Sequence, residues 1–175
     1  GNNRVLKAIK KGITLEQVRD ALRWTNEAGI NNSVNFIVGH KEETYGDALD
    51  TIKFAKSLPT NFVNFYNLLP YPGTESFEWA RQHADFLVPP DSFLENISYR
   101  DNNPIFETKE FSERQRKKVI ALGFDLYRER ILKFRLGSFL GGLIYWVTKS
   151  SRINKLATSF AVIGTRGWSF LSVRP

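Results

Sequence analysis

The sequence predicts an α/β protein that is followed by a mainly helical C-terminal extension. Helical segments and short apolar segments alternate over the first 85 residues, with short connections between them. From residue 111 onward, the apolar residues recur at helical spacing among many basic ones. Because short connections between alternating helices and strands are typical of right-handed crossovers, we expect parallel strands at 33–39 and 61–69.

The first elements are a helix over residues 14–28 and the strand that follows it. Thr14 and Gln17 have the spacing of a capping box, and Gly29 ends the run of apolar residues. Residues 33–39 are apolar, include β-branched side chains and close on a glycine. This pattern is typical of a buried parallel strand.

A second helix is predicted over residues 44–57, because Pro59 ends its apolar stripe. The strand at 61–69 stops at two prolines and a glycine in residues 70–73, and a third helix follows over 74–83. We expect the three helices to cover one face of the sheet. Two strands do not form a stable parallel sheet alone, so we also expect further strands upstream.

The chain divides by composition into three regions. Residues 1–85 carry the alternating pattern, residues 86–110 are irregular, and residues 111–175 form a basic helical tail with a predicted helix over 111–135. Thirteen uncharged residues follow at 136–148. Since a membrane-spanning helix needs about 20 apolar residues, this segment is not expected to span a membrane.

Charge separates the tail from the rest of the chain. Residues 1–110 contain 12 Lys/Arg and 15 Asp/Glu, whereas residues 111–175 contain 13 and 3. With Tyr145, Trp146 and Trp168 as interfacial aromatics, this excess predicts peripheral contact of residues 111–175 with an anionic membrane surface. The alternative is that the basic residues solubilise the tail and its apolar residues pack on the sheet domain. No basic motif interleaved with aromatics favours nucleic acid.

Composition excludes several kinds of chemistry. The chain has 42% hydrophobic and 25% charged residues, as in a folded soluble protein. It contains no cysteine and two histidines, so it has no disulfide, thiolate metal site, iron–sulfur ligand or cysteine nucleophile of its own. We expect neither catalytic residues nor metal ligands. No secretion signal opens the chain, and a cytoplasmic location, peripheral on the inner membrane face, is predicted.

Candidate binding residues lie where the predicted strands end, because ligands of parallel α/β folds collect there. Gly39 allows close backbone approach, and Glu43 stands at the start of the next helix. The prolines after the second strand leave backbone groups of Leu69 and Pro70 without ladder partners, and a planar ring could bind them. Each pattern on its own also fits an ordinary turn.

Amides within the strands are further candidates. Asn35 lies in the first strand, and Asn64 and Asn67 lie in the second. An amide that points into a binding site needs a hydrogen-bond partner, so Asn35 and Asn67 are predicted to contact a cofactor. Side chains alternate along a strand, and the sequence does not decide which face is which.

The order of motifs resembles the later part of the radical S-adenosylmethionine (SAM) core, in the branch that carries a cobalamin-binding domain. The matching segments are Gly-Asn-Asn-Arg-Val-Leu-Lys at 1–7, Thr14, Ile-Val-Gly at 37–39, Glu-Thr at 43–44 and Pro-Tyr-Pro-Gly-Thr at 70–74. The resemblance implies that residues 1–85 are the C-terminal portion of a (β/α) TIM-like barrel.

The resemblance also implies a role for each matching residue. Gly39 and Glu43 would lie beside the adenine of SAM, the backbone of Leu69 and Pro70 would approach the same ring, and Asn2 would lie near the ribose or methionine part. The departure from the family pattern is at residues 41 and 42, where Lys-Glu replaces Pro-Gly.

We therefore expect a fragment of a radical SAM enzyme that is inactive alone. The parent would cleave SAM to a 5′-deoxyadenosyl radical and use it in a step such as methyl transfer. The [4Fe-4S] cluster, and cobalamin, would be held by the missing N-terminal half of the barrel, which is the expected partner. One alternative is a non-catalytic α/β module whose basic tail binds a membrane surface, and another is a complete small protein without a cluster.

Overall fold

The computed structural model describes residues 1–90 and 102–149. Its chain divides into two compact units, Gly1–Tyr127 and a second that begins at Arg128, and each is described by itself. The elements of the first unit are α1 (Asn3–Ala8), α2 (Leu15–Glu27), β1 (Ser33–Val38), α3 (Tyr45–Ser57), β2 (Phe62–Asn67), α4 (Glu75–His83), β3 (Asp85–Phe86), β4 (Phe106–Glu107) and the start of α6 (Glu113–Leu136). The second unit contains the end of α6 and α7 (Ser138–Lys149).

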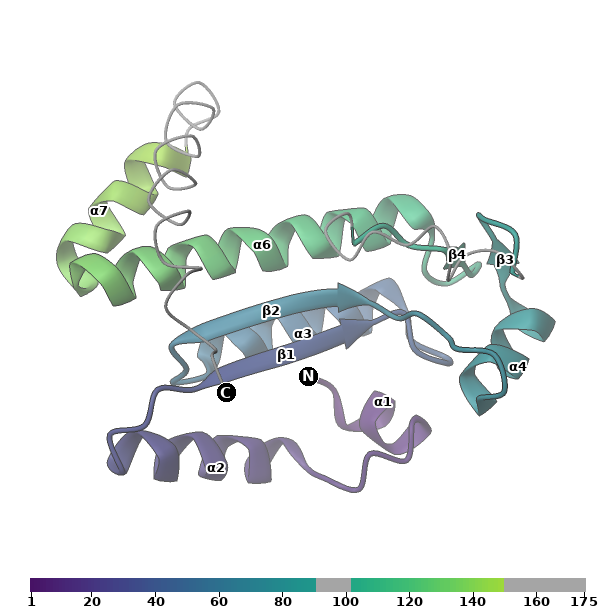
Figure 1. Cartoon of the computed structure of the whole chain (residues 1–175), viewed down its shortest axis with the longest axis horizontal. Coiled ribbons are helices and arrows are strands. Elements are labelled where there is room, and N and C mark those ends of the chain that lie inside the picture. The colour runs from purple at the N-terminus through teal and green to yellow at the C-terminus, as the bar shows by residue number, and fades with distance from the viewer. Residues whose placement is uncertain (91–101, 150–175) are drawn as a thin grey trace, which may run out of the picture. The chain divides into compact units, whose positions relative to one another are not determined.

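The central feature of the first unit is the pair of parallel strands β1 and β2, which run side by side in Figure 1. Their register pairs Ser33 with Phe62 and Val38 with Asn67. The prediction of adjacent parallel strands is confirmed, although β2 ends at Asn67, two residues earlier than expected. The described residues show α/β architecture with a helical C-terminal region, and these two strands do not form a barrel.

One face of the sheet is covered by helices, with α3 behind the strands in Figure 1. Phe36 of β1 and Phe65 of β2 point to this face, and their rings stack with centroids 4.9 Å apart. The same core includes Leu22 of α2, Ile52 of α3 and Val119 of α6. The predicted covering by the first two helices is thus confirmed.

The third predicted helix does not join this covering layer. Phe77 of α4 packs instead with Ile105 and Phe106 in a separate cluster. The start of α6 takes the expected place, because Gly123 lets its backbone approach Phe65 so closely that an added Cβ would lie 2.4 Å from the ring. The helix that follows β2 in the covering layer is therefore α6, which comes after the connector of residues 86–110.

Threonines begin the three helices that the sequence predicts in the first 85 residues. The Thr14 side chain accepts from the Gln17 backbone N–H at 3.2 Å, and the Gln17 side chain accepts from the Thr14 N–H at 2.8 Å. Thr44 and Asp47 form a second reciprocal capping box, and Thr74 caps α4. These caps satisfy backbone donors that have no partner within a helix.

The connector is more ordered than its sequence suggests. Short antiparallel strands β3 and β4 pair Asp85 with Glu107 and Phe86 with Phe106. The expectation of an irregular stretch over 86–110 therefore needs correction at both ends of the connector, while residues 91–101 lie outside the described part of the chain. The six-residue helix α1 was also not predicted.

Asn102 borders the outer edge of β2. Its side-chain amide donates to the Phe65 carbonyl at 2.7 Å and accepts from the Asn67 N–H at 2.8 Å. The Asn67 side chain donates in turn to the Asn102 carbonyl at 2.6 Å. One residue thus provides the hydrogen bonds that a neighbouring strand would make, and it reduces the exposure of the edge.

In the second unit, α6 and α7 are joined through Gly137, whose φ is +78°. None of the helices in residues 1–90 and 102–149 is long and apolar enough to cross a membrane. The predicted lipid contact also extends over residues 150–175, which include Trp168, and these residues lie outside the described part of the chain.

Candidate functional site

The turn after β1 is built around Glu43. This carboxylate is 4% exposed and accepts hydrogen bonds from the backbone N–H groups of Gly39 at 2.6 Å and His40 at 3.0 Å. Burial raises the pKa of Glu43, while the two hydrogen bonds act in the opposite direction. Gly39 has a φ of +95°, a conformation that favours glycine. The predicted site residues Gly39 and Glu43 are therefore brought together, with Glu43 fixing the turn.

Arg116 of α6 fills the space beside Gly39. A Cβ added to Gly39 would lie 2.1 Å from Nη1 of Arg116, so a side chain at position 39 would displace the guanidinium. The guanidinium carbon lies 4.2 Å from the ring centroid of Phe106 and 5.1 Å from that of Phe111. The sequence predicts that Gly39 admits a ligand to the backbone, whereas the structure shows an arginine of this chain against it.

Electrostatics link Arg116 to the same turn. Arg116 is 1% exposed, and its Nε donates to the Phe111 carbonyl at 3.2 Å. Burial lowers the pKa of Arg116 to about 10, against the opposing influence of Glu43 and Glu107. The side chain therefore stays charged at neutral pH and supplies a buried positive charge near the carboxyl end of β1.

His40 is the other titratable group of the turn. Burial is the main cause that lowers the pKa of His40 to about 4, with further lowering by nearby positive charges that include Arg116. A neutral imidazole is thus expected at physiological pH.

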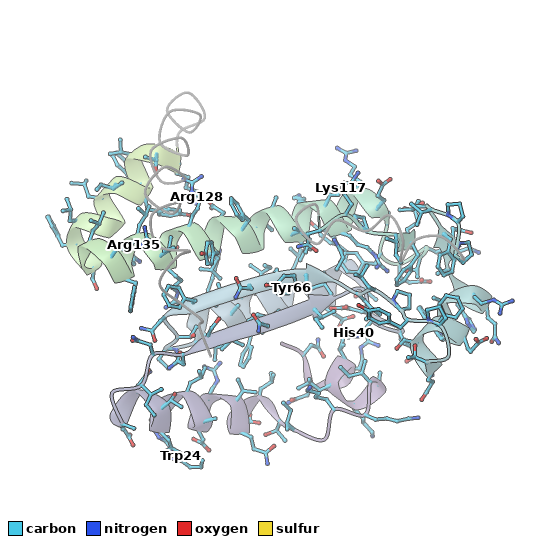
Figure 2. All side chains as sticks on the ribbon, viewed as in Figure 1. Trp24, His40, Tyr66, Lys117, Arg128 and Arg135 are labelled. Atoms are coloured by element: carbon cyan, nitrogen blue, oxygen red, sulfur yellow. The ribbon has the colours of Figure 1, made fainter. Side chains whose placement is uncertain are left out.

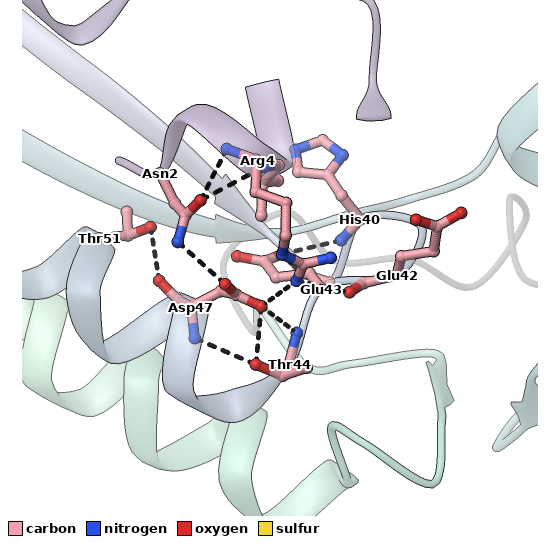
Figure 3. A network of polar contacts seen from close by, with 10 residues as sticks. Asn2, Arg4, His40, Glu42, Glu43, Thr44, Asp47 and Thr51 are labelled. Carbon is pink, nitrogen blue, oxygen red and sulfur yellow. Dashed lines mark hydrogen bonds and ion pairs between the residues drawn. The ribbon is translucent and has the colours of Figure 1, made fainter. Parts of the chain in front are cut away.

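A polar network joins the N-terminal segment to the start of α3 (Figure 3). Asn2 caps α1 by accepting from the Arg4 N–H at 2.8 Å, and its amide donates to Asp47 Oδ1 at 2.9 Å. Arg4 pairs with the other carboxylate oxygen of Asp47 and donates to the Glu42 carbonyl at 2.9 Å. The predicted cofactor residue Asn2 therefore uses its side chain to hold two segments of the chain together.

Asp47 is the centre of this network. Its Oδ2 accepts from the Thr44 N–H at 2.9 Å and from the Thr44 hydroxyl at 2.7 Å. Burial alone would raise the pKa of Asp47, but the hydrogen bonds from Thr44 and Arg4 outweigh it and lower the pKa. Sequence reasoning singled out neither Arg4 nor Asp47, although Thr44 and Asp47 have capping-box spacing and could have been found.

The two predicted asparagines point to opposite faces of the sheet. Asn35 is exposed on the face away from the helices, where its Oδ1 accepts from the Asn64 amide at 2.9 Å. Asn67 is buried on the helix-covered side and bonds to Asn102. The structure therefore does not bring Asn35 and Asn67 together. Its uncovered face carries Asn35, Asn64, Ile37 and Tyr66, the last two 47% and 45% exposed.

The segment after β2 reaches the same edge as the β1 turn, because the Leu68 N–H donates to the Val38 carbonyl at 2.8 Å. Leu69 packs against the second apolar cluster, and Pro70 is fully buried. A cleft of ≈ 960 Å³ opens nearby, and its lining includes Arg4, Glu43 and Trp79 of α4. The predicted site residues at the strand ends therefore share the carboxyl edge of the sheet.

Metal binding finds no donor set in this part of the chain. Within residues 1–90 and 102–149, no group of three or more acidic or histidine side chains is arranged to hold a metal ion. The whole chain also lacks cysteine. Because cysteine thiolates hold iron–sulfur clusters, the residues of this chain do not fit such a cluster.

Comparison with known families gives this edge a context. Residues 1–55, which include α1, β1 and the Glu43 turn, match the model of the radical SAM superfamily. This chain is related to the radical SAM superfamily. The match begins before the Asn2–Arg4 segment and extends past Asp47, so it includes both ends of the polar network.

Two curated relatives are similar over longer stretches. An uncharacterized methyltransferase of Pyrococcus horikoshii is 32% identical over 121 residues, which are 69% of this chain and 25% of that protein. A tRNA-2-methylthio-N(6)-dimethylallyladenosine synthase of a Sulfurihydrogenibium species is 26% identical over 179 residues, 94% of this chain and 39% of that protein. The chain thus spans less than half the length of either relative. No solved structure matches it significantly.

Proposed function

We propose that this chain is the C-terminal part of a radical SAM barrel and that the carboxyl edge of β1 and β2 forms part of the SAM site. The observation that carries the proposal is the division of the sheet into two faces. α2, α3 and α6 cover one face, while the other leaves Asn35, Ile37 and Tyr66 exposed. In a (β/α) barrel the helices lie outside, so the uncovered face would be the interior.

The residues present fit SAM better than they fit the cluster. Adenine, ribose and the methionine group of SAM need hydrogen-bonding groups beside apolar surface, and the Asn35–Asn64 pair lies next to the exposed Ile37–Tyr66 pair on the uncovered face. Bound SAM would supply a 5′-deoxyadenosyl radical after reductive cleavage. The residues of this chain would orient the nucleoside, and Glu43 and Asp47 would hold the turn and the N-terminal segment beside it.

The cluster would come from residues outside this chain. Within residues 1–90 and 102–149 no strand lies on the other side of β1, and a barrel needs strands there, since Asn102 already borders the outer edge of β2. We propose that the missing N-terminal half supplies both the strands and the cluster cysteines. A cobalamin-binding domain in the same parent, predicted from the order of motifs, is part of this proposal.

The names of the two relatives support a reaction class for the parent. One relative is named a methyltransferase and the other a methylthio-forming synthase. We propose that the parent transfers a one-carbon or methylthio group through radical chemistry. A cytoplasmic location accompanies this proposal, because the [4Fe-4S] cluster of such an enzyme needs a reducing compartment.

The test uses the full-length protein with its cluster reconstituted under anaerobic conditions. Asn35→Leu should weaken SAM binding roughly tenfold, the loss of about 1.4 kcal/mol expected when a hydrogen-bonding amide in the site is replaced by an apolar group. Asn31→Leu is the matched control, since Asn31 is also exposed but precedes the amino end of β1. Isothermal titration with SAM measures both variants.

Three outcomes would contradict the proposal. The first is a coding sequence upstream of Gly1 without a Cys-x-x-x-Cys-x-x-Cys motif. The second is a reconstituted protein that forms no 5′-deoxyadenosine from SAM and reductant. The third is equal loss of SAM affinity in Asn35→Leu and Asn31→Leu, which would remove the uncovered face from the site.

A further inference from the structure

The end of α6 and α7 form a tight helical hairpin, defined here as residues 128–149. Gly137 turns the chain between the two helices. A Cβ added to Gly141 would lie 2.4 Å from the Leu132 carbonyl oxygen, so the two backbones approach each other closely. The Arg128 guanidinium donates to the Thr148 hydroxyl at 3.3 Å, farther along the hairpin. The inner face of α7 is therefore occupied by α6.

The outer face of α7 is apolar and exposed. Phe139 is 86% exposed, Trp146 73% and Leu143 49%, and their spacing of four and three residues places them on one stripe of the helix. Leu140 and Val147 border the stripe at 48% and 40% exposure. Large apolar side chains that form a contiguous exposed patch usually mark a site of interaction with another molecule or a membrane.

The hairpin that carries this stripe is rich in basic residues. The hairpin contains the five basic residues Arg128, Arg130, Lys133, Arg135 and Lys149, against the single acidic residue Glu129. Figure 2 labels Arg128 at the open end of the hairpin and Arg135 near its turn. An exposed apolar stripe that includes a tryptophan, in a hairpin with an excess of basic residues, is typical of helices that lie in a membrane interface.

We propose that the hairpin docks on an anionic lipid surface, with the stripe of Phe139, Leu143 and Trp146 inserted at the headgroup boundary. Charge complementarity selects this occupant. A second copy would bring two hairpins of net charge +4 together, as counted from their five basic and one acidic residues. An anionic surface instead attracts each basic residue with about a fivefold gain in partitioning.

The test is co-sedimentation of the full chain with vesicles of phosphatidylglycerol and phosphatidylcholine, and with vesicles of phosphatidylcholine alone. Binding is expected to the anionic vesicles and to fall as salt rises, because exposed charges are screened over about 10 Å at 0.1 M. Trp146→Ser should lower binding roughly tenfold through loss of buried aromatic area. Trp24→Ser is the matched control, since Trp24 is 60% exposed on α2.

A second pair of variants tests the charges. Arg135→Gln should lower binding to anionic vesicles about fivefold. Lys53→Gln on α3 removes an equally charged side chain that is 77% exposed outside the hairpin, and it should leave binding unchanged. Circular dichroism spectra that match the spectrum of the unsubstituted chain would show that all four variants are folded.

Several results would overturn the proposal. They are a chain that stays in the supernatant at low salt, equal binding to the two kinds of vesicle, and equal losses in Trp146→Ser and Trp24→Ser. If sedimentation shows a dimer that Trp146→Ser dissociates, the stripe is a protein contact instead. None of these readouts needs SAM or the upstream region, so they are independent of the proposed function.

Discussion

The turn after β1 and the hairpin depart from ordinary burial in opposite directions. At the turn, the charged side chains of Glu43 and Arg116 are 4% and 1% exposed. On the hairpin, Phe139 and Trp146 are 86% and 73% exposed. Buried charges and exposed large apolar groups are the two informative exceptions to the usual distribution of residues.

The two regions are stabilised differently. A buried charge is expensive to desolvate, so its partners are needed to hold the fold. An exposed aromatic ring contributes little to the fold and is available for another surface. Substitutions at the turn should therefore change the free energy of unfolding, whereas substitutions on the apolar stripe should change binding.

The largest effect is expected for Arg116→Met. Loss of the guanidinium removes the stacking on Phe106 and Phe111 and leaves Glu43 buried with one positive charge fewer nearby. Removing one partner from buried charges typically costs about 3–5 kcal/mol, so we expect a loss of about 3 kcal/mol in the free energy of unfolding. Urea denaturation followed by circular dichroism measures it.

Arg116→Lys is the control for charge without the planar guanidinium, and it should lose less stability than Arg116→Met. The double variant Arg116→Met with Glu43→Gln should recover part of the loss, because the buried carboxylate is then neutral. If Arg116→Met and the unsubstituted chain have equal free energies of unfolding, Arg116 does not stabilise the turn.

A smaller effect is expected for Gly39→Ala, compared with Gly29→Ala. Both glycines have positive φ, +95° and +70°, so both substitutions carry conformational strain of about 1 kcal/mol. Only Gly39 has a side chain in its Cβ space, the Arg116 guanidinium, while nothing lies within 4 Å of the corresponding position at Gly29. Gly39→Ala should therefore lose roughly 2 kcal/mol more than Gly29→Ala in urea denaturation. If the two variants lose equal free energy of unfolding, backbone strain at positive φ accounts for both losses and the contact with Arg116 adds nothing.

Local signals were sufficient for most of the first unit. The threonine caps, Pro59 and Gly29 placed α2 and α3 to within a residue, and the parallel pairing of β1 and β2 followed from the short connections. α1 was missed because six residues give too little periodicity for a pattern to be recognised. The sequence therefore predicted the elements that are determined by helix caps and local propensity.

The remaining features depend on distant contacts. Arg116 lies 77 positions after Gly39, and nothing in the local sequence relates the two. The same reason explains why α6 rather than α4 covers the sheet, and why Asn102 borders β2. The two faces of the strands also could not be assigned, because both carry asparagine and aromatic residues.

The smallest effect is expected on the hairpin, where Phe139→Ser should change the free energy of unfolding by less than about 0.5 kcal/mol. Phe139 is 86% exposed, so its ring loses little contact with the fold when it is removed. Gly141→Ala is the contrasting variant on the inner face of the same helix. Its Cβ would meet the Leu132 carbonyl oxygen at 2.4 Å, and overpacking of this kind costs about 1–3 kcal/mol.

Thermal and urea denaturation of the two variants in the absence of lipid would show which face of α7 stabilises the hairpin. If Phe139→Ser is as destabilising as Gly141→Ala, then the apolar stripe packs on protein in solution and belongs to the fold, like the turn after β1. If only Gly141→Ala loses stability, the inner face of α7 holds the hairpin together. The apolar side chains on the outer face of α7 then do not stabilise the fold, and contact with another surface explains their presence there.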